Sequence, residues 1–338
     1  MTSLERVLTA LSFKEPDRVP LFLLLTMHGA KELHLSIEEY FSKAEYVVEG
    51  QLKLREKYKH DSIYSFFYAP IEVEAWGGDV IYYKNGPANS GRPIFSSKEK
   101  ILNFKPPKVK ECDCLNKVLK ATEMLKAEVK DTVPIIGVTI SPFSLPVMQM
   151  GFDNYIDLIY NDKETFNHLM EMNEAFTVEW GNAQLEAGAT AICYFDPVSS
   201  PTIIPKELYI ETGFEIAKRT ISKLNGPTAT HLASGRSLAI TDYLAQTGTA
   251  VVGSSVDDDL IEMKKACDGK LTILGNLNGI KMASWTPEEA ELAVKEAIEK
   301  ASKGGGFILS DNHGEIPFQV PDETLMAISD AVHKWGQY

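Results

Sequence analysis

The sequence predicts an α/β protein built as a single (β/α)8 barrel. Strand-like runs of apolar and β-branched residues alternate with helix-like segments, which is typical of parallel strands joined by crossover helices. A chain of 338 residues suits one barrel with insertions. A doubly wound open sheet is the alternative, but no glycine-rich phosphate-binding loop follows the first strand. We therefore expect one domain over residues 1–338.

The amino-terminal half contains three of the expected strands and one insertion. Thr2 and Glu5 have the spacing of a capping box, which indicates a short first helix. The following elements are expected in this order: a strand over Val19–Leu25, a helix over Ser36–Lys59, a strand over Ser62–Tyr68, a hairpin of Asp79–Lys84 and Arg92–Phe95, a helix over Leu115–Val129 and a strand over Pro134–Ile140. The hairpin surrounds Asn85-Gly86, a favoured tight-turn sequence, and is expected to be a small insertion.

The carboxy-terminal half alternates more regularly. The expected helices are Asp162–Gly188, Lys206–Leu224, Leu238–Gln246 and Leu260–Cys267. The expected strands are Thr190–Phe195, Thr228–Leu232, Ala250–Ser254 and Leu271–Leu274. Thr286, Pro287 and Glu289 mark the start of the next helix, and Gly304–Gly306 mark its end. A strand over Phe307–Ser310 and a helix over Asp322–Trp335 complete about eight βα units.

Composition narrows the class of function. A net charge of −13 argues against nucleic acid, because phosphate binding needs a basic surface. No apolar run approaches the roughly 18 residues of a membrane helix. Four cysteines without a secretory signal indicate a reducing, cytoplasmic compartment. The oligomeric state is left open.

Polar residues follow several of the expected strands. In a barrel, the carboxyl ends of the strands meet at one mouth. Asp196 and His231 each follow a strand-like run, and Glu211 lies on the helical stretch between them. Two carboxylates and an imidazole that converge there could hold a zinc ion with one open position. His28, Asn276 and His313 are further candidates for this mouth.

Aromatic residues near the expected mouth could pack on a substrate ring. The candidates for this role are Phe67, Tyr68 and Tyr194. Each site residue also has a plainer interpretation. Asp196 could be a turn residue, Glu211 a solvated helix residue, His231 a core histidine, and the aromatic residues part of the core.

Several segments resemble the uroporphyrinogen decarboxylase superfamily. They are Glu15–Pro20, Tyr194–Pro197, Gly275–Leu277 and Gly305–Ser310. The resemblance spans nearly the whole chain and implies a (β/α)8 barrel. It also implies one of two chemistries, which are decarboxylation of a porphyrinogen and methyl transfer to or from a corrinoid protein, usually assisted by zinc.

The chain departs from two branches of that superfamily. The decarboxylase branch has an arginine-rich segment that grips substrate carboxylates, and Leu25–Ala30 contains no arginine here. The expected aspartate is also absent from Phe66–Ala69, although His313-Gly314 does resemble a decarboxylase His-Gly pair. The branch that methylates coenzyme M uses a His-x-Cys zinc motif, in which Ala233 replaces the cysteine.

The first methyltransferase components of O-demethylase systems provide a closer resemblance. Asp196, Glu211 and His231 are spaced similarly to a Glu, Glu, His zinc motif of that group. The resemblance implies demethylation of a small methylated substrate, such as a methoxylated aromatic, onto a corrinoid carried by a separate protein. Zinc would polarise the ether oxygen as a Lewis acid. The alternatives are a thiol (coenzyme M) methyltransferase, a decarboxylase, and a non-catalytic module that binds a corrinoid protein.

Overall fold

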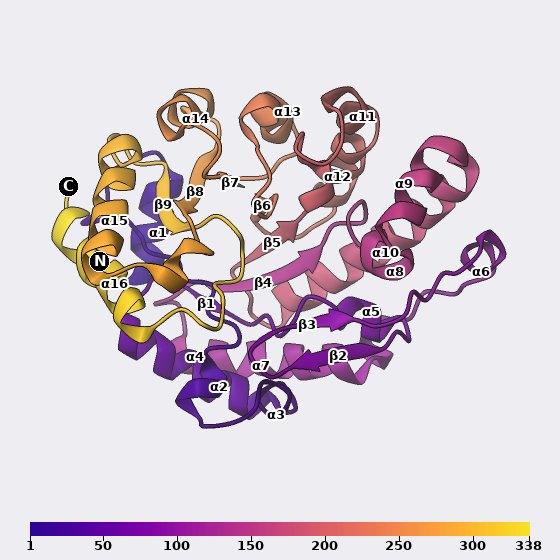
Figure 1. Ribbon diagram of the computed structural model, residues 1–338, viewed down its shortest axis with the longest axis horizontal. Helices are drawn as coiled ribbons and strands as arrows, with labels where there is room; N and C mark the ends of the chain where they lie inside the picture. Colours follow the sequence, from indigo (N-terminus) through magenta and orange to yellow (C-terminus); the bar gives the residue numbers. More distant parts are fainter.

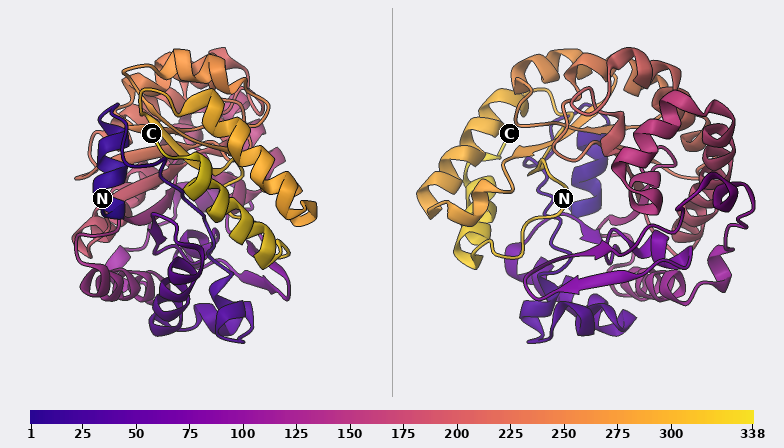
Figure 2. Two further views of the ribbon diagram at one scale, coloured as in Figure 1. Left: turned by 90° about the vertical axis from the view of Figure 1, so that its left-hand side faces the viewer. Right: turned by 45° about the vertical axis from the view of Figure 1, so that its right-hand side comes forward.

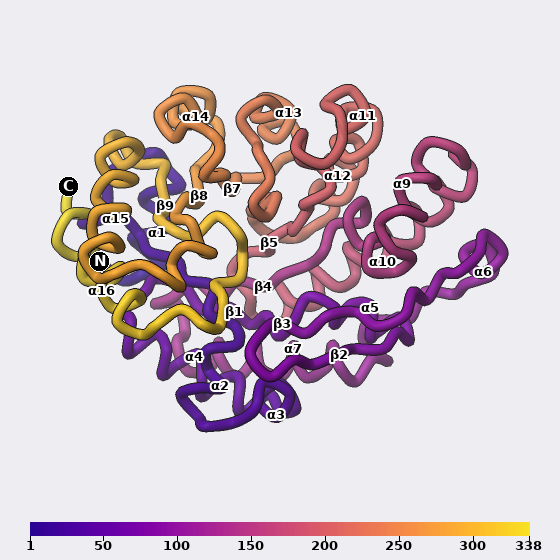
Figure 3. The backbone as a smooth tube through the Cα atoms, viewed as in Figure 1, coloured from indigo at the N-terminus to yellow at the C-terminus, as the bar shows by residue number.

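The computed structural model describes residues 1–338 and has a curved parallel sheet surrounded by helices (Figure 1). Seven strands form this sheet in the order β1-β4-β5-β6-β7-β8-β9. Their bounds are β1 Ile63–Tyr64, β4 Ile135–Ile140, β5 Ala191–Phe195, β6 Thr228–His231, β7 Val251–Gly253, β8 Thr272–Leu277 and β9 Phe307–Asp311. Neighbouring strands pair in parallel throughout, and the tube drawing shows how the sheet curls (Figure 3).

The expected first strand, Val19–Leu25, is not a regular strand, but it lies between β9 and β1. The Phe22 N–H donates to the Leu309 carbonyl at 2.8 Å, and the Asp61 N–H donates to the Leu21 carbonyl at 2.7 Å. Leu21 also forms an isolated parallel bridge with Leu309. Pro20 has no N–H to contribute to a ladder, which explains the irregular pairing. This segment takes the place of the eighth strand, as a barrel requires.

All helices except α1 lie outside the sheet, and α1 lies within the ring of strands and helices (Figure 2). Their bounds are α1 Ser3–Leu11, α2 Gly29–Glu32, α3 Ile37–Phe41, α4 Ala44–Tyr58, α5 Ile71–Ala75, α6 Lys98–Leu102, α7 Asp113–Val129, α8 Pro146–Met150, α9 Phe152–Asn161, α10 Lys163–Glu186, α11 Lys206–Glu211, α12 Gly213–Ile221, α13 Thr241–Gln246, α14 Leu260–Cys267, α15 Pro287–Ala301 and α16 Asp322–Trp335. None of them combines the length and apolar character that a membrane crossing requires.

Helix α1 packs across the amino-terminal end of the strands. The Leu4 N–H donates to the Thr132 carbonyl, and the Gly306 N–H donates to the Ala10 carbonyl, both at 3.0 Å. Thr132 and Gly306 precede β4 and β9, so α1 is fixed to two strand ends. The capping box of Thr2 and Glu5 is confirmed, and so is that of Thr286 and Glu289.

Several boundaries differ from those expected. The helix expected over Ser36–Lys59 is divided into α3 and α4, because Lys43 is extended. The helix expected over Lys206–Leu224 is divided at Thr212, which is not helical (φ −127°, ψ −83°). The insertion is a hairpin of β2 Val80–Tyr83 and β3 Gly86–Ser90, so Arg92–Phe95 lies beyond its second strand.

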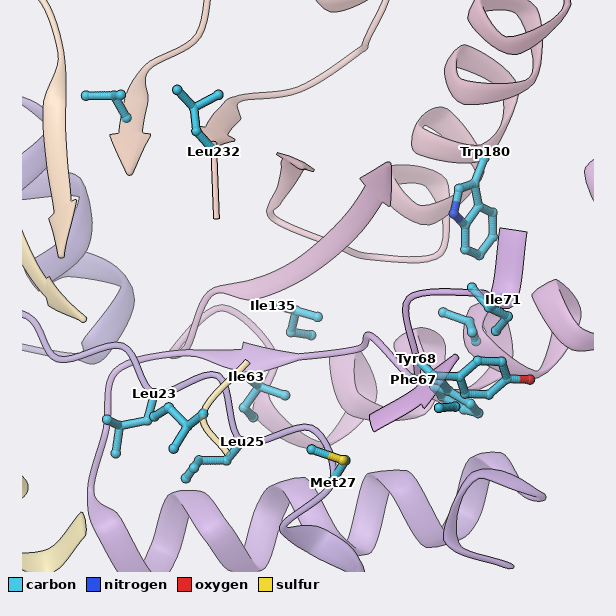
Figure 4. Close-up of a cluster of buried hydrophobic side chains, with 14 of the residues drawn as sticks. Leu23, Leu25, Met27, Ile63, Phe67, Tyr68, Ile71, Ile135, Trp180 and Leu232 are labelled. Carbon is cyan, nitrogen blue, oxygen red and sulfur yellow. The ribbon is translucent and has the colours of Figure 1, made fainter. Parts of the chain in front are cut away.

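Buried apolar side chains form two layers, one on each face of the sheet. The larger cluster lies between the sheet and the helices and includes Leu23, Leu25, Ile63, Phe67 and Tyr68 (Figure 4). A smaller cluster lines the inside of the barrel; its nine buried members are Val7, Phe22, Tyr64, Ile136, Val138, Cys193, Val251, Leu274 and Ile308. Successive residues of a strand point to opposite faces, so each strand supplies both layers.

Candidate active site

A cavity of about 410 Å³ lies inside the barrel. Its wall consists mostly of apolar side chains from the strands and from α1, including Leu4, Val7, Leu8, Ile136, Val138, Ile140, Cys193, Val251, Leu274 and Ile308. A small-molecule site typically has a volume of about 300–1,000 Å³. The interior of this barrel therefore has room for a ligand, whereas most such barrels are filled by side chains.

Polar groups gather at the carboxyl ends of the strands. The polar lining there comes from His231 at the end of β6, Ser310 in β9, and His313 and Glu315 in the loop after β9. Pro87, Ala88 and Asn89 of the hairpin insertion also line the cavity. No lysine or arginine lines the cavity. An anionic ligand would therefore have no opposite charge to pair with.

The imidazole of His231 has a defined orientation. Its Nδ1 accepts the backbone N–H of Ala233 at 3.0 Å, and its ring stacks on Phe195 at 5.6 Å. Burial lowers the pKa of His231 to about 4, and nearby His313 adds to this effect. The ring is neutral at pH 7, and because Nδ1 accepts a hydrogen bond, the proton is on Nε2. His231 can therefore donate a hydrogen bond from Nε2.

The loop after β9 is held by Asp311. One oxygen, Oδ2, accepts the N–H groups of His313 at 2.8 Å and Gly314 at 2.9 Å, while Oδ1 is buried without a partner. Gly314 has a φ of +104°, and a Cβ there would lie 3.1 Å from the Phe195 ring. This tight turn fixes the positions of His313 and Glu315 at the cavity. Burial raises the pKa of Asp311 to about 7, against opposing backbone hydrogen bonds.

Glu315 is the only carboxylate that lines the cavity. Its Oε1 is buried and has no hydrogen-bond partner. Burial raises the pKa of Glu315 to about 8, and the charge of Asp311 raises it further, while the Met27 backbone amide opposes the shift. The raised pKa favours the protonated form of Glu315 at pH 7.

The three residues that the sequence suggested as zinc ligands do not meet. Asp196 is buried outside the cavity, where its Oδ1 accepts hydrogen bonds from Ser141 Oγ at 2.5 Å and Ser144 Oγ at 2.7 Å. Glu211 is exposed in a groove between α10 and α12 on the outside of the barrel. Only His231 faces the cavity. Glu211 ends a short helix whose one buried residue is Tyr209, so its side chain points to solvent.

The donor set for a bound zinc ion is therefore not present as predicted. No group of three or more His, Cys, Asp or Glu side chains has the arrangement of a metal site. Asp196 already accepts two hydroxyl hydrogen bonds, and the ring nitrogen of His231 nearer the backbone accepts an amide hydrogen bond. The ligand set of Asp196, Glu211 and His231 does not fit a zinc ion.

The three aromatic residues proposed as substrate contacts face the helices instead of the cavity. Phe67 packs on Phe41 with ring centroids 5.7 Å apart, and the Tyr68 hydroxyl donates to Glu74 at 2.6 Å. Tyr194 packs against α12. Their chain neighbours Phe66 and Phe195 line the cavity. Phe195 does so because successive side chains of a strand alternate between faces. A shift of one residue in the assumed facing explains the error at Tyr194. Phe67 and Tyr68 lie in the irregular segment after β1, where both side chains pack outward.

His28 and Asn276 also lie outside the cavity wall. His28 is buried beside Phe318, with ring centroids 5.8 Å apart, and burial lowers its pKa to about 3. The Asn276 Nδ2 group donates to the Ser255 carbonyl at 3.0 Å. His313 lines the cavity as expected, and burial lowers its pKa.

Glu315 is the site residue that sequence reasoning missed. A signal was present, since Glu315 follows His313-Gly314 just beyond the last strand, in a segment already expected at the mouth. What could not be read from the sequence was whether its carboxylate points into the barrel.

Comparisons with known proteins cover the whole barrel. A family model described as "Uroporphyrinogen decarboxylase (URO-D)" matches residues 2–335. A uroporphyrinogen decarboxylase of Janthinobacterium sp. (strain Marseille) is 25% identical over 302 residues, which cover 86% of this chain and 82% of that protein. A uroporphyrinogen decarboxylase of Geobacter sp. (strain M21) is 29% identical over 229 residues, which cover 64% of this chain and 65% of that protein.

Two solved structures are similar in fold. A methyltransferase from Methanosarcina mazei superposes with a TM-score of 0.88 at 20% identity, and the match covers 99% of both chains. A B12-independent methionine synthase from Shewanella sp. W3-18-1 superposes with a TM-score of 0.61 at 13% identity, and the match covers 95% of both chains. At these identities the likeness establishes the barrel fold alone.

Proposed function

Because the chain belongs to the uroporphyrinogen decarboxylase (URO-D) family, we propose that it is an enzyme that acts on a small substrate bound inside its barrel. The reaction we propose is methyl transfer from an uncharged methylated substrate, such as a methoxylated aromatic, to the cobalt of a corrinoid protein. One observation carries the choice of substrate: the cavity is apolar and contains no lysine or arginine.

The size and lining of the cavity support a neutral aromatic substrate. An apolar cavity of roughly 150 Å³ can hold benzene, so about 410 Å³ is enough for a substituted ring. Tyr64, Phe66 and Phe195 offer aromatic faces for packing. His231 can donate its Nε2–H to an ether oxygen placed at the mouth. The corrinoid protein would approach this mouth, since the acceptor must reach the methyl carbon in line with the carbon–oxygen bond.

Porphyrinogen decarboxylation is the second candidate, because the relatives carry that name. Its substrate is a tetrapyrrole with many carboxylates. Such a ligand needs guanidinium or ammonium partners, which the cavity does not supply. Burying unpaired carboxylates in an apolar wall would cost several kcal/mol each by the usual transfer scales. The lining therefore favours the uncharged methylated substrate.

Methyl transfer in the other direction, from a corrinoid protein to a thiol such as coenzyme M, is a third candidate. Ala233 stands where that branch has a zinc-binding cysteine. The Ala233 N–H is occupied by His231 Nδ1, and no thiol other than that of Cys193 lines the cavity. Burial raises the pKa of Cys193 to about 12, so it is not a thiolate at neutral pH. The cavity lining therefore supports methyl transfer to a thiol less well than methyl transfer from an uncharged ether.

The first prediction tests substrate charge. The purified protein should transfer methyl from methoxyphenol to a reduced O-demethylase corrinoid protein, followed by the corrinoid absorbance. Methoxybenzoate should react with a kcat/KM lower by at least about 100-fold, because its carboxylate finds no cation. Calorimetry without the corrinoid protein should show the same preference in binding.

Two parallel assays distinguish the competing functions. One measures decarboxylation of uroporphyrinogen, and the other measures methylation of coenzyme M by a methylated corrinoid protein. Turnover in either assay, with no transfer from any methoxyarene, would reject the proposed reaction. Equal binding of methoxyphenol and methoxybenzoate would reject the inference from the missing cations.

A further inference from the structure

Glu315 has the position and environment of a group that acts on a ligand. Its side chain lines the cavity at the mouth, and its buried Oε1 has no hydrogen-bond partner within the protein. Buried polar groups are nearly always hydrogen-bonded, so an unpartnered carboxyl oxygen beside an apolar cavity requires an explanation. Because Oε1 is closed off from the cavity, a bound ligand cannot be its partner, and the protonated form of the carboxyl group leaves this oxygen without a charge.

The groups around Glu315 do not provide a positive charge. Asp311 on β9 is a second carboxyl, and burial keeps its pKa near 7. His231 on β6 and His313 in the same loop are both held toward the neutral form by burial, and so is His28 beyond the first strand. The Met27 backbone amide is the one group that favours the carboxylate, and burial outweighs it. The protonated form of Glu315, which has a transferable proton, is therefore favoured at neutral pH.

We propose that Glu315 is the proton donor to the oxygen that leaves when the methyl group is transferred. This role rests on the proposed methyl transfer and adds to it the residue that activates the leaving group. The nucleophile is the Co(I) centre of the corrinoid protein, which is a substrate of this enzyme. A bond forms between the methyl carbon and cobalt as the methyl–oxygen bond breaks. The electron pair of the broken bond stays on oxygen, which takes the Glu315 proton and leaves as a neutral phenol.

Glu315 is a better donor than the other groups at the mouth. The neutral imidazole of His231 holds its Nε2–H far more tightly than a carboxylic acid whose pKa is about 8 holds its proton. His231 is therefore suited to hydrogen-bond the ether oxygen and position it. After release of the phenol, the Glu315 carboxylate regains a proton from water, because its apolar surroundings favour the neutral acid. General acids of this kind contribute about 10²- to 10⁴-fold to a rate.

The second prediction compares Glu315→Gln with the wild type on two ethers. Gln keeps the shape and can donate a hydrogen bond but cannot transfer a proton. We expect kcat/KM for methoxyphenol to fall by about 100-fold or more. For nitroanisole, whose nitrophenolate leaves without a proton, the loss should be less than about 10-fold. The wild-type kcat/KM for methoxyphenol should decline as pH rises through about 8, and the variant should lack this decline.

Two controls separate this role from a structural one. Calorimetric binding of methoxyphenol should change by less than about 3-fold in Glu315→Gln, since the cavity shape is kept. Infrared spectra of the whole protein at pH 7 should contain a protonated-carboxyl band that is weaker in the variant.

Each outcome has a distinct meaning. Equal losses with the two ethers, or an unchanged pH profile, would overturn the proton-donor role while leaving methyl transfer intact. If the wild-type protein transfers no methyl group from any ether, the proposed function and this role fail together. In that case the infrared band still decides whether Glu315 is protonated, which is independent of turnover.

Discussion

At the scale of single residues, side-chain direction decided which residues belong to the site. Phe195 and Tyr194 are neighbours in β5, yet Phe195 lines the cavity and Tyr194 packs on α12. Phe66 and Phe67 divide in the same way just after β1. Glu211 lies between β5 and β6 in the sequence, and Glu315 follows β9. Only Glu315 lines the cavity, whereas Glu211 lies in an outer groove. Residue type alone did not separate these pairs.

The third prediction concerns Glu211. Because Glu211 is exposed in an outer groove, Glu211→Gln should change kcat/KM by less than about 2-fold and should not alter the zinc content of the purified protein. Metal analysis and the methyl-transfer assay check both statements. If Glu211→Gln lost bound zinc together with activity, Glu211 would be a zinc ligand after all, which would contradict its position in the structure.

At the scale of elements, the irregular first segment is held by buried ion pairs and not by a full strand ladder. Asp61, which precedes β1, accepts hydrogen bonds from Arg6 Nη1 at 2.7 Å and Arg18 Nη1 at 2.6 Å. It also accepts the Leu21 N–H at 2.9 Å. One carboxylate therefore joins α1, the first segment and β1 at the amino-terminal end of the barrel. Neutralising it would leave the buried Arg18 guanidinium without its carboxylate partner and would leave Arg6 paired with Asp17 alone.

The fourth prediction is that Asp61→Asn destabilises the barrel by about 3 kcal/mol or more, as expected when one partner of a buried ion pair is removed. The melting temperature and the urea midpoint should both fall. Asp79→Asn is the matched control, because Asp79 pairs with Arg92 at 3.8 Å on the exposed surface. Exposed pairs contribute about 0–1 kcal/mol. Equal effects of the two substitutions would refute a closing role for Asp61.

At the scale of the whole molecule, buried titratable groups lower the stability of the fold at both high and low pH. Burial raises the pKa values of Glu72 and Glu315 to about 8 and of Asp311 to about 7. Burial lowers the pKa values of His60 and His231 to about 4 and of His28 to about 3. All six groups are therefore neutral in the folded protein over a wide pH range, whereas the unfolded chain charges them.

The fifth prediction follows from the sign of these shifts. Above the ordinary carboxyl pKa values of 3.8 for Asp and 4.5 for Glu, the unfolded chain releases the three carboxyl protons that the folded protein keeps. Stability therefore falls as pH rises toward 7 for Asp311 and toward 8 for Glu72 and Glu315. Below the ordinary histidine pKa of 6.5, these three histidines bind protons in the unfolded chain but stay neutral in the folded protein. The free energy of unfolding therefore falls as pH drops toward 4. The two trends oppose each other between about 4.5 and 6.5.

Scanning calorimetry should therefore give the highest melting temperature in that interval and a lower one at pH 8. Glu72→Gln removes one of the three carboxyl groups and is not part of the cavity wall. It should reduce the difference in melting temperature between pH 6 and pH 8. A melting temperature that rises steadily to pH 8 would show that these carboxyls are ionised in the fold.

The sequence by itself determined the order of strands and helices, and hence the barrel. Alternation of apolar runs with amphipathic segments is a local property, and so are the capping boxes at Thr2 and Thr286, which the structure confirms. His231 and His313 could be expected at the mouth because each follows a strand in the sequence. Helices α8 and α9 were not expected, although α9 is longer than α13 and α14, and both lie in the connection between β4 and α10.

Only the tertiary structure decided which side chains enter the cavity. Whether Phe66 or Phe67 faces inward depends on how the segment after β1 packs against neighbours far along the chain. Whether Glu211 or Glu315 reaches a common point depends on distances between elements that no local pattern encodes. The open interior is likewise a property of the assembled wall, since the space left inside a barrel is set by all its strands together. Local sequence rules determine the elements, and long-range packing determines the site.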